Sequence, residues 1–141
     1  MADEFRVSLV DDPEDSAVTT VGFGLRDFNL MQAGENNYRR LCVFVHAPDN
    51  SVIGGLIAST YWAWLYVDLL WVKEEYRGQG HGGRLLSAAE DEARRRGAKH
   101  AYLDTFSFQS PGFYLERGYE VFGELTDFPE GHQRYFLRKR L

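Results

Sequence analysis

The sequence of 141 residues is poor in cysteine and in long apolar runs. Its single cysteine, Cys42, excludes an intramolecular disulfide and favours a reducing compartment. No apolar stretch reaches the length of a membrane-spanning helix. Residues 1–6 lack the basic start and apolar run of a signal peptide. We therefore expect one cytoplasmic domain over residues 1–141, without membrane contact.

An excess of positive charge is also missing. The chain carries 16 Lys and Arg residues against 21 Asp and Glu, a net charge of −5, which argues against nucleic-acid binding. Residues 1–72 hold 4 basic and 10 acidic residues, whereas residues 73–141 hold 12 and 11. This asymmetry suits a cationic substrate that meets an anionic cofactor, and it equally suits a solvated acidic surface.

The apolar pattern predicts a mixed sheet in an α/β or α+β domain. Apolar residues at every second position, and short continuous apolar runs, indicate strands. Seven segments fit this description: 4–10, 39–46, 52–60, 66–72, 100–105, 119–124 and 134–140. The centre of the domain is then a strand, a glycine-rich loop, a helix and a strand.

Helical signals lie between these segments. Asp12 and Pro13 predict the start of a helical region, which Gly22 and Gly24 divide into two short helices that end near residue 34. The clearest helix covers 82–96, because its apolar side chains fall on one face. A shorter helix is expected over 111–117.

The chemistry is concentrated in the run Arg77-Gly78-Gln79-Gly80-His81-Gly82-Gly83. Glycines between a strand and a helix let backbone N–H groups close around an anion, and the helix N-terminus adds partial positive charge. Arg77 and Arg84 flank the glycines with full charges. This loop therefore predicts a phosphate or pyrophosphate ligand.

Gly78, Gly80 and Gly83 also satisfy the dinucleotide fingerprint G-x-G-x-x-G, and Asp104 ends the next strand. In the dinucleotide fold, however, the first glycine follows its strand almost at once, and here residues 73–77 intervene. The chain also offers only one clear βαβ unit. A Walker A loop is excluded because no Gly-Lys-Ser/Thr follows.

Val72, the loop and the following Leu85-Leu86 together resemble the acyl-CoA signature of the GNAT superfamily of N-acetyltransferases. That signature, Arg/Gln-x-x-Gly-x-Gly/Ala, is matched by Arg77, Gly80 and Gly82. The expected order of elements also follows the family along nearly the whole chain. The resemblance implies a mostly antiparallel sheet of about seven strands with flanking helices.

The resemblance also implies a cofactor site. Loop 77–83 would hold the pyrophosphate of acetyl-CoA, the co-substrate, and no metal would be needed. Leu70, Trp71 and Val72 would pair with the pantetheine arm, and an N–H group there would polarise the thioester carbonyl. The strands that end near Val72 and begin near Leu103 would splay apart around the cofactor. Many members of the family dimerise, which makes a homodimer possible.

The segment 107–119 resembles the family pattern Asn-x-x-Ala-x-x-Φ-Tyr-x-x-x-Gly-Φ, where Φ is hydrophobic. Tyr114 takes the tyrosine position, from which many relatives protonate the departing thiolate. A phenol with a reference pKa of ~10 is protonated at neutral pH and can do so. Packing is the alternative role. Ser107 replaces the usual asparagine and is the candidate pantetheine contact, and Ser110 replaces the usual alanine.

Asp68 is the candidate general base, because the amine must lose a proton before it attacks. It lies within a strand, four residues before Val72, where relatives often carry an acidic residue. A carboxylate on a largely apolar strand needs a partner or a function, so a structural role is the alternative. Cys42 lies in a strand expected to be fully buried, which indicates an inert thiol and direct attack of the amine.

These residues predict an acetyl-CoA-dependent N-acetyltransferase that acts on a small-molecule or peptide amine. The alternative is a noncatalytic acyl-CoA-binding module on the same fold, which would need the loop but neither Tyr114 nor Asp68. A nicotinamide-dependent oxidoreductase is a remote third alternative that rests on the fingerprint alone. The sequence does not identify the acceptor amine.

Overall fold

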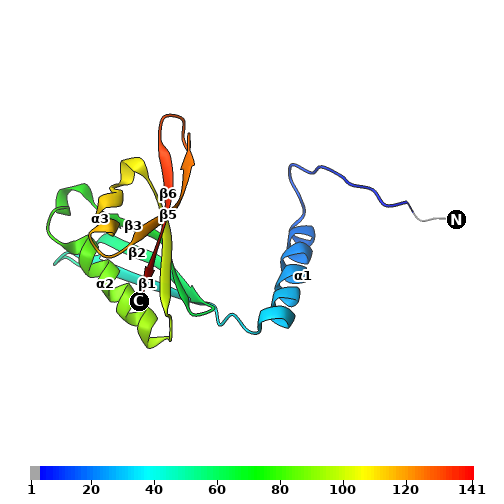
Figure 1. Ribbon diagram of the computed structural model, residues 1–141, viewed down its shortest axis with the longest axis horizontal. Coiled ribbons are helices and arrows are strands. Elements are labelled where there is room, and N and C mark those ends of the chain that lie inside the picture. The colour runs from blue at the N-terminus through cyan, green and yellow to red at the C-terminus, as the bar shows by residue number, and fades with distance from the viewer. Residues whose placement is uncertain (1–3) are drawn as a thin grey trace. The chain divides into compact units, whose positions relative to one another are not determined.

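The computed structural model describes residues 4–141 and divides the chain into two compact units, one up to Asn36 and one from Asn37 to Leu141 (Figure 1). The expected single domain over residues 1–141 stays a prediction, and residues 1–3 of that range lie outside the described part.

The N-terminal unit contains one helix, α1 (Asp15–Ala33). The expected interruption at Gly22 and Gly24 is wrong, because each glycine costs a helix only about 1 kcal/mol and the neighbouring residues compensate. The expected start is also wrong, since Glu14 rather than Asp12 is the N-cap residue. The helix ends at Gly34, which has a φ of 80° and donates its N–H to the Leu30 carbonyl.

The expected strand over residues 4–10 is absent, because this segment has no regular secondary structure. Its apolar side chains Phe5, Val7 and Leu9 are almost fully exposed. Alternation makes a segment competent to form a strand, but the strand forms only where a partner supplies hydrogen bonds.

The second unit contains a six-stranded sheet, one strand fewer than expected, in the order β1-β2-β3-β4-β6-β5. Only β3 and β4 are parallel, and every other neighbouring pair is antiparallel. The mostly antiparallel, mixed sheet of the prediction is therefore confirmed. The strands are β1 (Arg39–His46), β2 (Val52–Tyr61), β3 (Trp64–Val72), β4 (His100–Phe106), β5 (Glu120–Thr126) and β6 (Gln133–Arg140).

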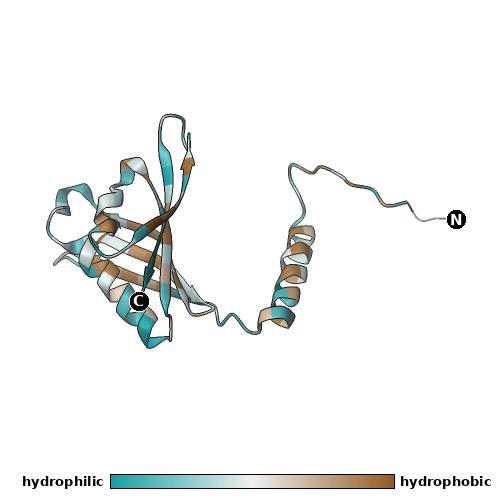
Figure 2. Ribbon diagram, in the orientation of Figure 1, coloured by the Kyte–Doolittle hydropathy of each residue, from teal (hydrophilic) through white to brown (hydrophobic). Residues whose placement is uncertain are grey.

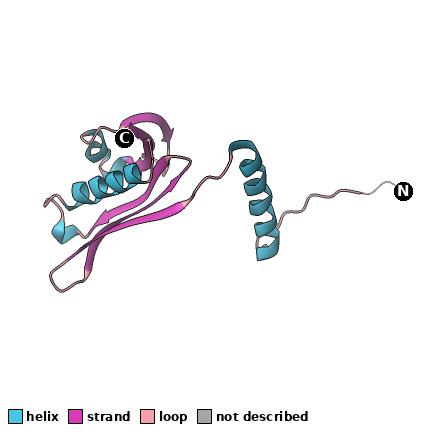
Figure 3. Cartoon of the chain, turned by 90° about the horizontal axis from the view of Figure 1, so that it is seen from below, coloured by secondary structure: helices cyan, strands magenta, loops and turns pink. Residues whose placement is uncertain are grey.

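The helix α2 (His81–Arg95) covers one face of the sheet and packs against β1, β2 and β3 (Figure 3). Leu85, Leu86, Ala89 and Ala93 are buried along its inner face, as the apolar stripe predicts. Figure 2 shows polar residues at the C-terminal end of this helix and apolar residues along the central strands. The helix stops before Gly97, whose φ of 89° continues the chain in the left-handed region.

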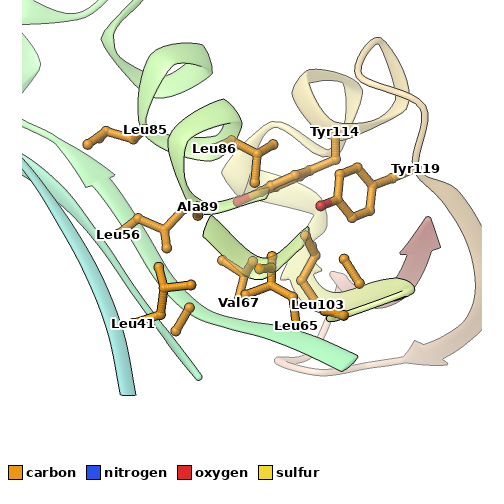
Figure 4. Close-up of a cluster of buried hydrophobic side chains, with 14 of the residues drawn as sticks. Leu41, Leu56, Leu65, Val67, Leu85, Leu86, Ala89, Leu103, Tyr114 and Tyr119 are labelled. Carbon is orange, nitrogen blue, oxygen red and sulfur yellow. The ribbon is translucent and has the colours of Figure 1, made fainter. Parts of the chain in front are cut away.

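The core lies between α2 and the inner face of the sheet (Figure 4). Its largest fully buried side chains are Leu56, Leu65, Leu86, Leu103 and Leu137. Tyr114 and Tyr119 join this cluster from the segment around α3 (Pro111–Leu115). Their rings pack edge to face, with 5.9 Å between the ring centroids. Tyr114 is therefore placed by packing against the same core that holds β3 and β4.

The expectation that residues 41–45 are fully buried is wrong. Leu41 in β1 is buried, whereas its neighbour Cys42 is exposed. The reason is that α2 covers one face of the sheet, so successive side chains of β1 alternate between the core and the other face. Among residues 4–141, no helix is both long and apolar enough to cross a membrane.

Candidate active site

β3 and β4 are paired along only part of their length. Their parallel ladder ends at Val67 and Leu103, although β3 continues to Val72 and β4 to Phe106. Beyond the ladder the strands diverge around a cavity of about 610 Å³. The expected splay of these two strands is therefore confirmed.

Leu70, Trp71 and Val72 all line this cavity. This part of β3 still pairs with β2 on its other side, and within residues 4–141 it has no strand partner on the side of β4. Backbone N–H and C=O groups are obligatory hydrogen-bonding groups. The free edge of β3 is therefore suited to an extended ligand that carries amides, bound as an added strand.

Asp68 is the extra residue of a β-bulge. Val67 pairs with Ala58 and Leu69 with Ile57, which leaves Asp68 without an opposite residue in β2. A bulge bends its strand and re-aims a side chain, and bulges are frequent beside active sites. The exposed carboxylate of Asp68 lines the cavity, with the Tyr66 hydroxyl 3.5 Å from its Oδ1.

Tyr114 reaches the same cavity from α3. Its side chain is only 9% exposed. Burial, with a smaller contribution from the negative charge of Asp104, raises the pKa of Tyr114 to about 12. At neutral pH Tyr114 is thus a protonated phenol beside the cavity.

The glycine loop leads directly into α2. Gly78 and Gly80 have φ values of 76° and 85°, which side chains rarely tolerate. Gly80 is the N-cap residue, and Arg84 N–H donates the first helical bond, to the Gly80 carbonyl. The N–H groups at the start of a helix have no partner within it. They are available, at the positive end of the helix dipole, for the expected phosphate.

Arg77 and Arg117 stand on either side of this loop. The Nε of Arg77 donates to the Val72 carbonyl at 2.7 Å, which ties the end of β3 to the loop. Arg117 lies 3.9 Å from the centre of the Phe113 ring, and a Cβ added to Gly83 would meet its guanidinium at 2.9 Å. The guanidinium of Arg117 thus lies directly against the backbone of Gly83.

The sequence did not single out Arg117 as a functional residue. Its position in the chain carries no recognisable signal, because its approach to the loop depends on the packing of α3 against α2. Arg117, His81, Gly80 and Gly83 line a second hollow, of about 690 Å³, beside the loop. The guanidinium of Arg117 brings further positive charge to the expected phosphate site.

Three sequence candidates, Ser107, Gln79 and Gly82, do not line the cavity between β3 and β4. The Ser107 hydroxyl accepts a hydrogen bond from the Gln133 N–H at 3.1 Å and is not part of the cavity lining. Gln79 is exposed in the loop, and Gly82 is half-buried against the Phe113 ring. Asp104 lines the cavity but is paired with Arg134 at 2.6 Å. Across residues 4–141, no group of three or more metal-ligating side chains could hold a metal.

Comparison with known proteins agrees with this geometry. The model of the acetyltransferase (GNAT) family matches residues 8–119. The chain belongs to this family. Its glycine loop, divergent strands and Tyr114 all lie within the matched range, which leaves the dinucleotide alternative without support.

Three similar proteins illustrate the relationship. A crystal structure assigned as an acetyltransferase of Agrobacterium tumefaciens has a TM-score of 0.89 and 37% identity, over 97% of this chain and 100% of that one. Blasticidin-S acetyltransferase of Streptomyces morookaense is 43% identical over 89 residues, 62% of this chain and 65% of that protein. A structure assigned as a streptothricin acetyltransferase of Bacillus anthracis, in complex with acetyl coenzyme A, shares the fold at 18% identity, with a TM-score of 0.65 over 72% of this chain and 62% of that one.

Proposed function

We propose that the protein transfers the acetyl group of acetyl-CoA to a primary amine by direct attack within a ternary complex. One observation carries the proposal: a single cavity between the divergent ends of β3 and β4 is lined by both Asp68 and Tyr114. A noncatalytic acyl-CoA-binding module would need neither side chain. The cavity therefore favours an enzyme over a binding module.

The residues around the cavity fit coenzyme A. The N–H groups of loop 77–83 and the guanidinium of Arg117 would hold the pyrophosphate, and the free edge of β3 at residues 70–72 would bind the pantetheine amides. When bound, acetyl-CoA supplies an acetyl group activated as a thioester. The complex of the Bacillus anthracis structure with acetyl coenzyme A supports this cofactor for the fold.

Asp68 accepts a proton from the incoming ammonium, directly or through water, because the bulge aims its carboxylate into the cavity. Tyr114 donates a hydrogen bond to the departing thiolate. A thiol has a reference pKa of ~8.5, so complete proton transfer from a phenol whose pKa is about 12 is uphill. Tyr114 therefore acts mainly by stabilising the developing negative charge.

The relatives named for blasticidin S and streptothricin make these two compounds the first acceptors to test. The experiment is an acceptor screen in which free CoA thiol is measured, with peptide amines, polyamines and amino acids alongside. We expect thiol release that depends on both acetyl-CoA and an amine. Tight acetyl-CoA binding without release for any amine would support the noncatalytic module instead.

We also propose a homodimer and a cytoplasmic location. α1 buries none of its residues, and Phe5, Val7 and Leu9 expose apolar surface, which is characteristic of association sites. The single cysteine favours the cytoplasm. Light scattering after gel filtration tests the dimer. A monomeric mass for the wild-type chain at assay concentration would contradict it.

A further inference from the structure

A further pocket, separate from the cavity and from the hollow beside the loop, lies on the face of the sheet opposite α2. Tyr102 faces this side, because its neighbours Ala101 and Leu103 in β4 are buried in the core beneath α2. The pocket has a volume of about 480 Å³. Five aromatic rings and one guanidinium line it: Tyr61, Trp62, Trp64, Tyr102, Phe122 and Arg138.

Trp62 occupies a backbone position that is unfavourable for tryptophan. It forms, with Ala63, the two-residue turn between Tyr61 and Trp64, and the two φ values are 44° and 61°. Turns with two positive φ values strongly prefer Asn-Gly, because large side chains are strained there. The 40% exposed ring of Trp62 lines the pocket instead of packing into the core. Such strain is typical of functional sites.

A row of aromatic rings connects this pocket with Asp68. Trp64 meets Tyr102 edge to face at 5.8 Å, and Tyr102 stacks on Tyr66 at 4.8 Å. The Tyr66 hydroxyl in turn lies 3.5 Å from Asp68 Oδ1. Asp68 follows Trp64 by four positions in β3, which corresponds to roughly 13 Å along a strand.

The charges at the pocket are already compensated. Arg138 donates to Glu120 at 3.0 Å and lies over the Phe122 ring at 5.4 Å. The Tyr61 and Tyr102 hydroxyls are bonded to each other. The remaining surface is made of aromatic faces and edges, which favour a neutral planar ring in offset or edge-to-face contact.

We propose that this pocket binds a planar, uncharged ring of the acceptor, while the acceptor's primary amine lies at Asp68. The inference rests on the proposed acetyl transfer and narrows its substrate class to elongated amines. In these amines, roughly 10–13 Å separate a terminal ring from the reactive nitrogen. Short aryl amines reach only one of the two positions.

The test uses two series of amines, phenylalkylamines with two to eight methylenes and n-alkylamines of the same lengths. We expect kcat/KM to rise with chain length for the phenyl series and to exceed that of the matched alkyl amine by roughly tenfold at the longer lengths. Phe122→Ala and Trp62→Gly should each remove most of this advantage, mainly through KM. Trp62→Gly also relieves the unfavourable turn, so the fold should be retained.

Leu125→Ala is the matched control, because Leu125 is also a half-exposed apolar residue of β5 and is not part of the pocket lining. It should keep the full advantage of the phenyl series. Equal kcat/KM for phenyl and alkyl amines at every length would overturn the proposal. The proposal would also be overturned if Phe122→Ala and Trp62→Gly both retained the advantage of the phenyl series. A change in the dimer mass of these two variants without a change in their selectivity would overturn it as well.

Failure of the proposed acetyl transfer is separable from failure of the pocket. If no amine releases CoA thiol, calorimetric binding of the six-methylene phenylalkylamine to the CoA-bound protein still reports on the pocket. Binding that Phe122→Ala weakens and Leu125→Ala does not weaken would support the ring site. Absence of binding to the wild type would overturn it.

Discussion

The hydroxyl of Tyr119 donates a 2.8 Å hydrogen bond to the carboxylate of Glu90, which is only 6% exposed on the inner face of α2. Lys139 in β6 places its Nζ 2.9 Å from the same carboxylate. This buried network joins α2, the segment after α3 and β6. The Tyr119 ring packs edge to face against Tyr114, so the network helps to hold Tyr114 in place.

Lys139→Met should lower the free energy of unfolding by ~3–5 kcal/mol, because it leaves a buried carboxylate without its cation. Urea unfolding at neutral pH would measure the change. The double variant Glu90→Gln with Lys139→Met should recover much of the loss, since no buried charge remains. If Lys139→Met alone were as stable as the wild type, water would already solvate the Glu90 carboxylate.

Gly80→Asp should weaken acetyl-CoA binding by at least tenfold, because it adds negative charge and a side chain where backbone approaches phosphate. Calorimetry on the folded variant would measure the affinity. Gly97→Asp is the matched control, since Gly97 has a similar φ of 89° at the opposite end of α2. If both variants bind acetyl-CoA like the wild type, the pyrophosphate lies elsewhere.

Asp68→Asn should shift the rise of the pH–rate profile to higher pH and leave acetyl-CoA affinity nearly unchanged. The reason is that the amide cannot accept the proton of the ammonium, so only amine already deprotonated in solution reacts. Initial rates between pH 6 and 10 would show the shift. An unchanged profile would assign the base to solvent or to another group.

The sequence predicted β1 at its observed bounds and α2 nearly so, because both are strongly patterned and pack locally. Segment 4–10 shows the limit of such reasoning: Phe5, Val7 and Leu9 alternate properly, yet pairing is a long-range property that alternation does not encode. Cys42 shows a related limit. The run around it is continuously apolar, and only the one-sided cover by α2 decides which side chains are buried.

The candidate site divides in the same way. The glycine loop is a local motif, so its backbone geometry follows from the sequence. The surroundings of Arg117 and Ser107 depend on how α3 and β6 pack. The sequence therefore does not reveal that Arg117 lies against Gly83, or that the Ser107 hydroxyl accepts a bond from Gln133. The bulge at Asp68 arises from the register of β3 against β2, which no residue pattern in either strand reveals.

Alkaline pH should destabilise the fold through its buried tyrosines. Burial raises the pKa of Tyr114 to about 12 and, still further, that of Tyr119. A tyrosine whose pKa is raised above its unfolded value of ~10 contributes stability to the fold that is fully present below pH 10. This stability is lost as the pH rises toward 12, by ~1.4 kcal/mol per pH unit for each such tyrosine. Urea unfolding from pH 9.5 to 11.5 should show a smaller decline for Tyr114→Phe than for the wild type. Equal declines for the two proteins would mean that folding does not raise the pKa of Tyr114.

Tyr114→Phe should reduce kcat by roughly 10²–10³, the range for loss of one donor that stabilises a developing negative charge. The ring keeps its contacts with Tyr119 and Phe113, so the melting temperature and the KM for acetyl-CoA should change little. The hydroxyl acts mainly in the transition state. Steady-state kinetics with the best acceptor from the screen would measure both constants.

The acyl donor separates charge stabilisation from misalignment of the cofactor. With a thioester whose thiol leaves more easily, the rate difference between wild type and Tyr114→Phe should shrink, because a weaker base needs less stabilisation. Misalignment would reduce kcat equally for both donors. A variant with near-normal kcat on acetyl-CoA would make Tyr114 a packing residue without a catalytic role.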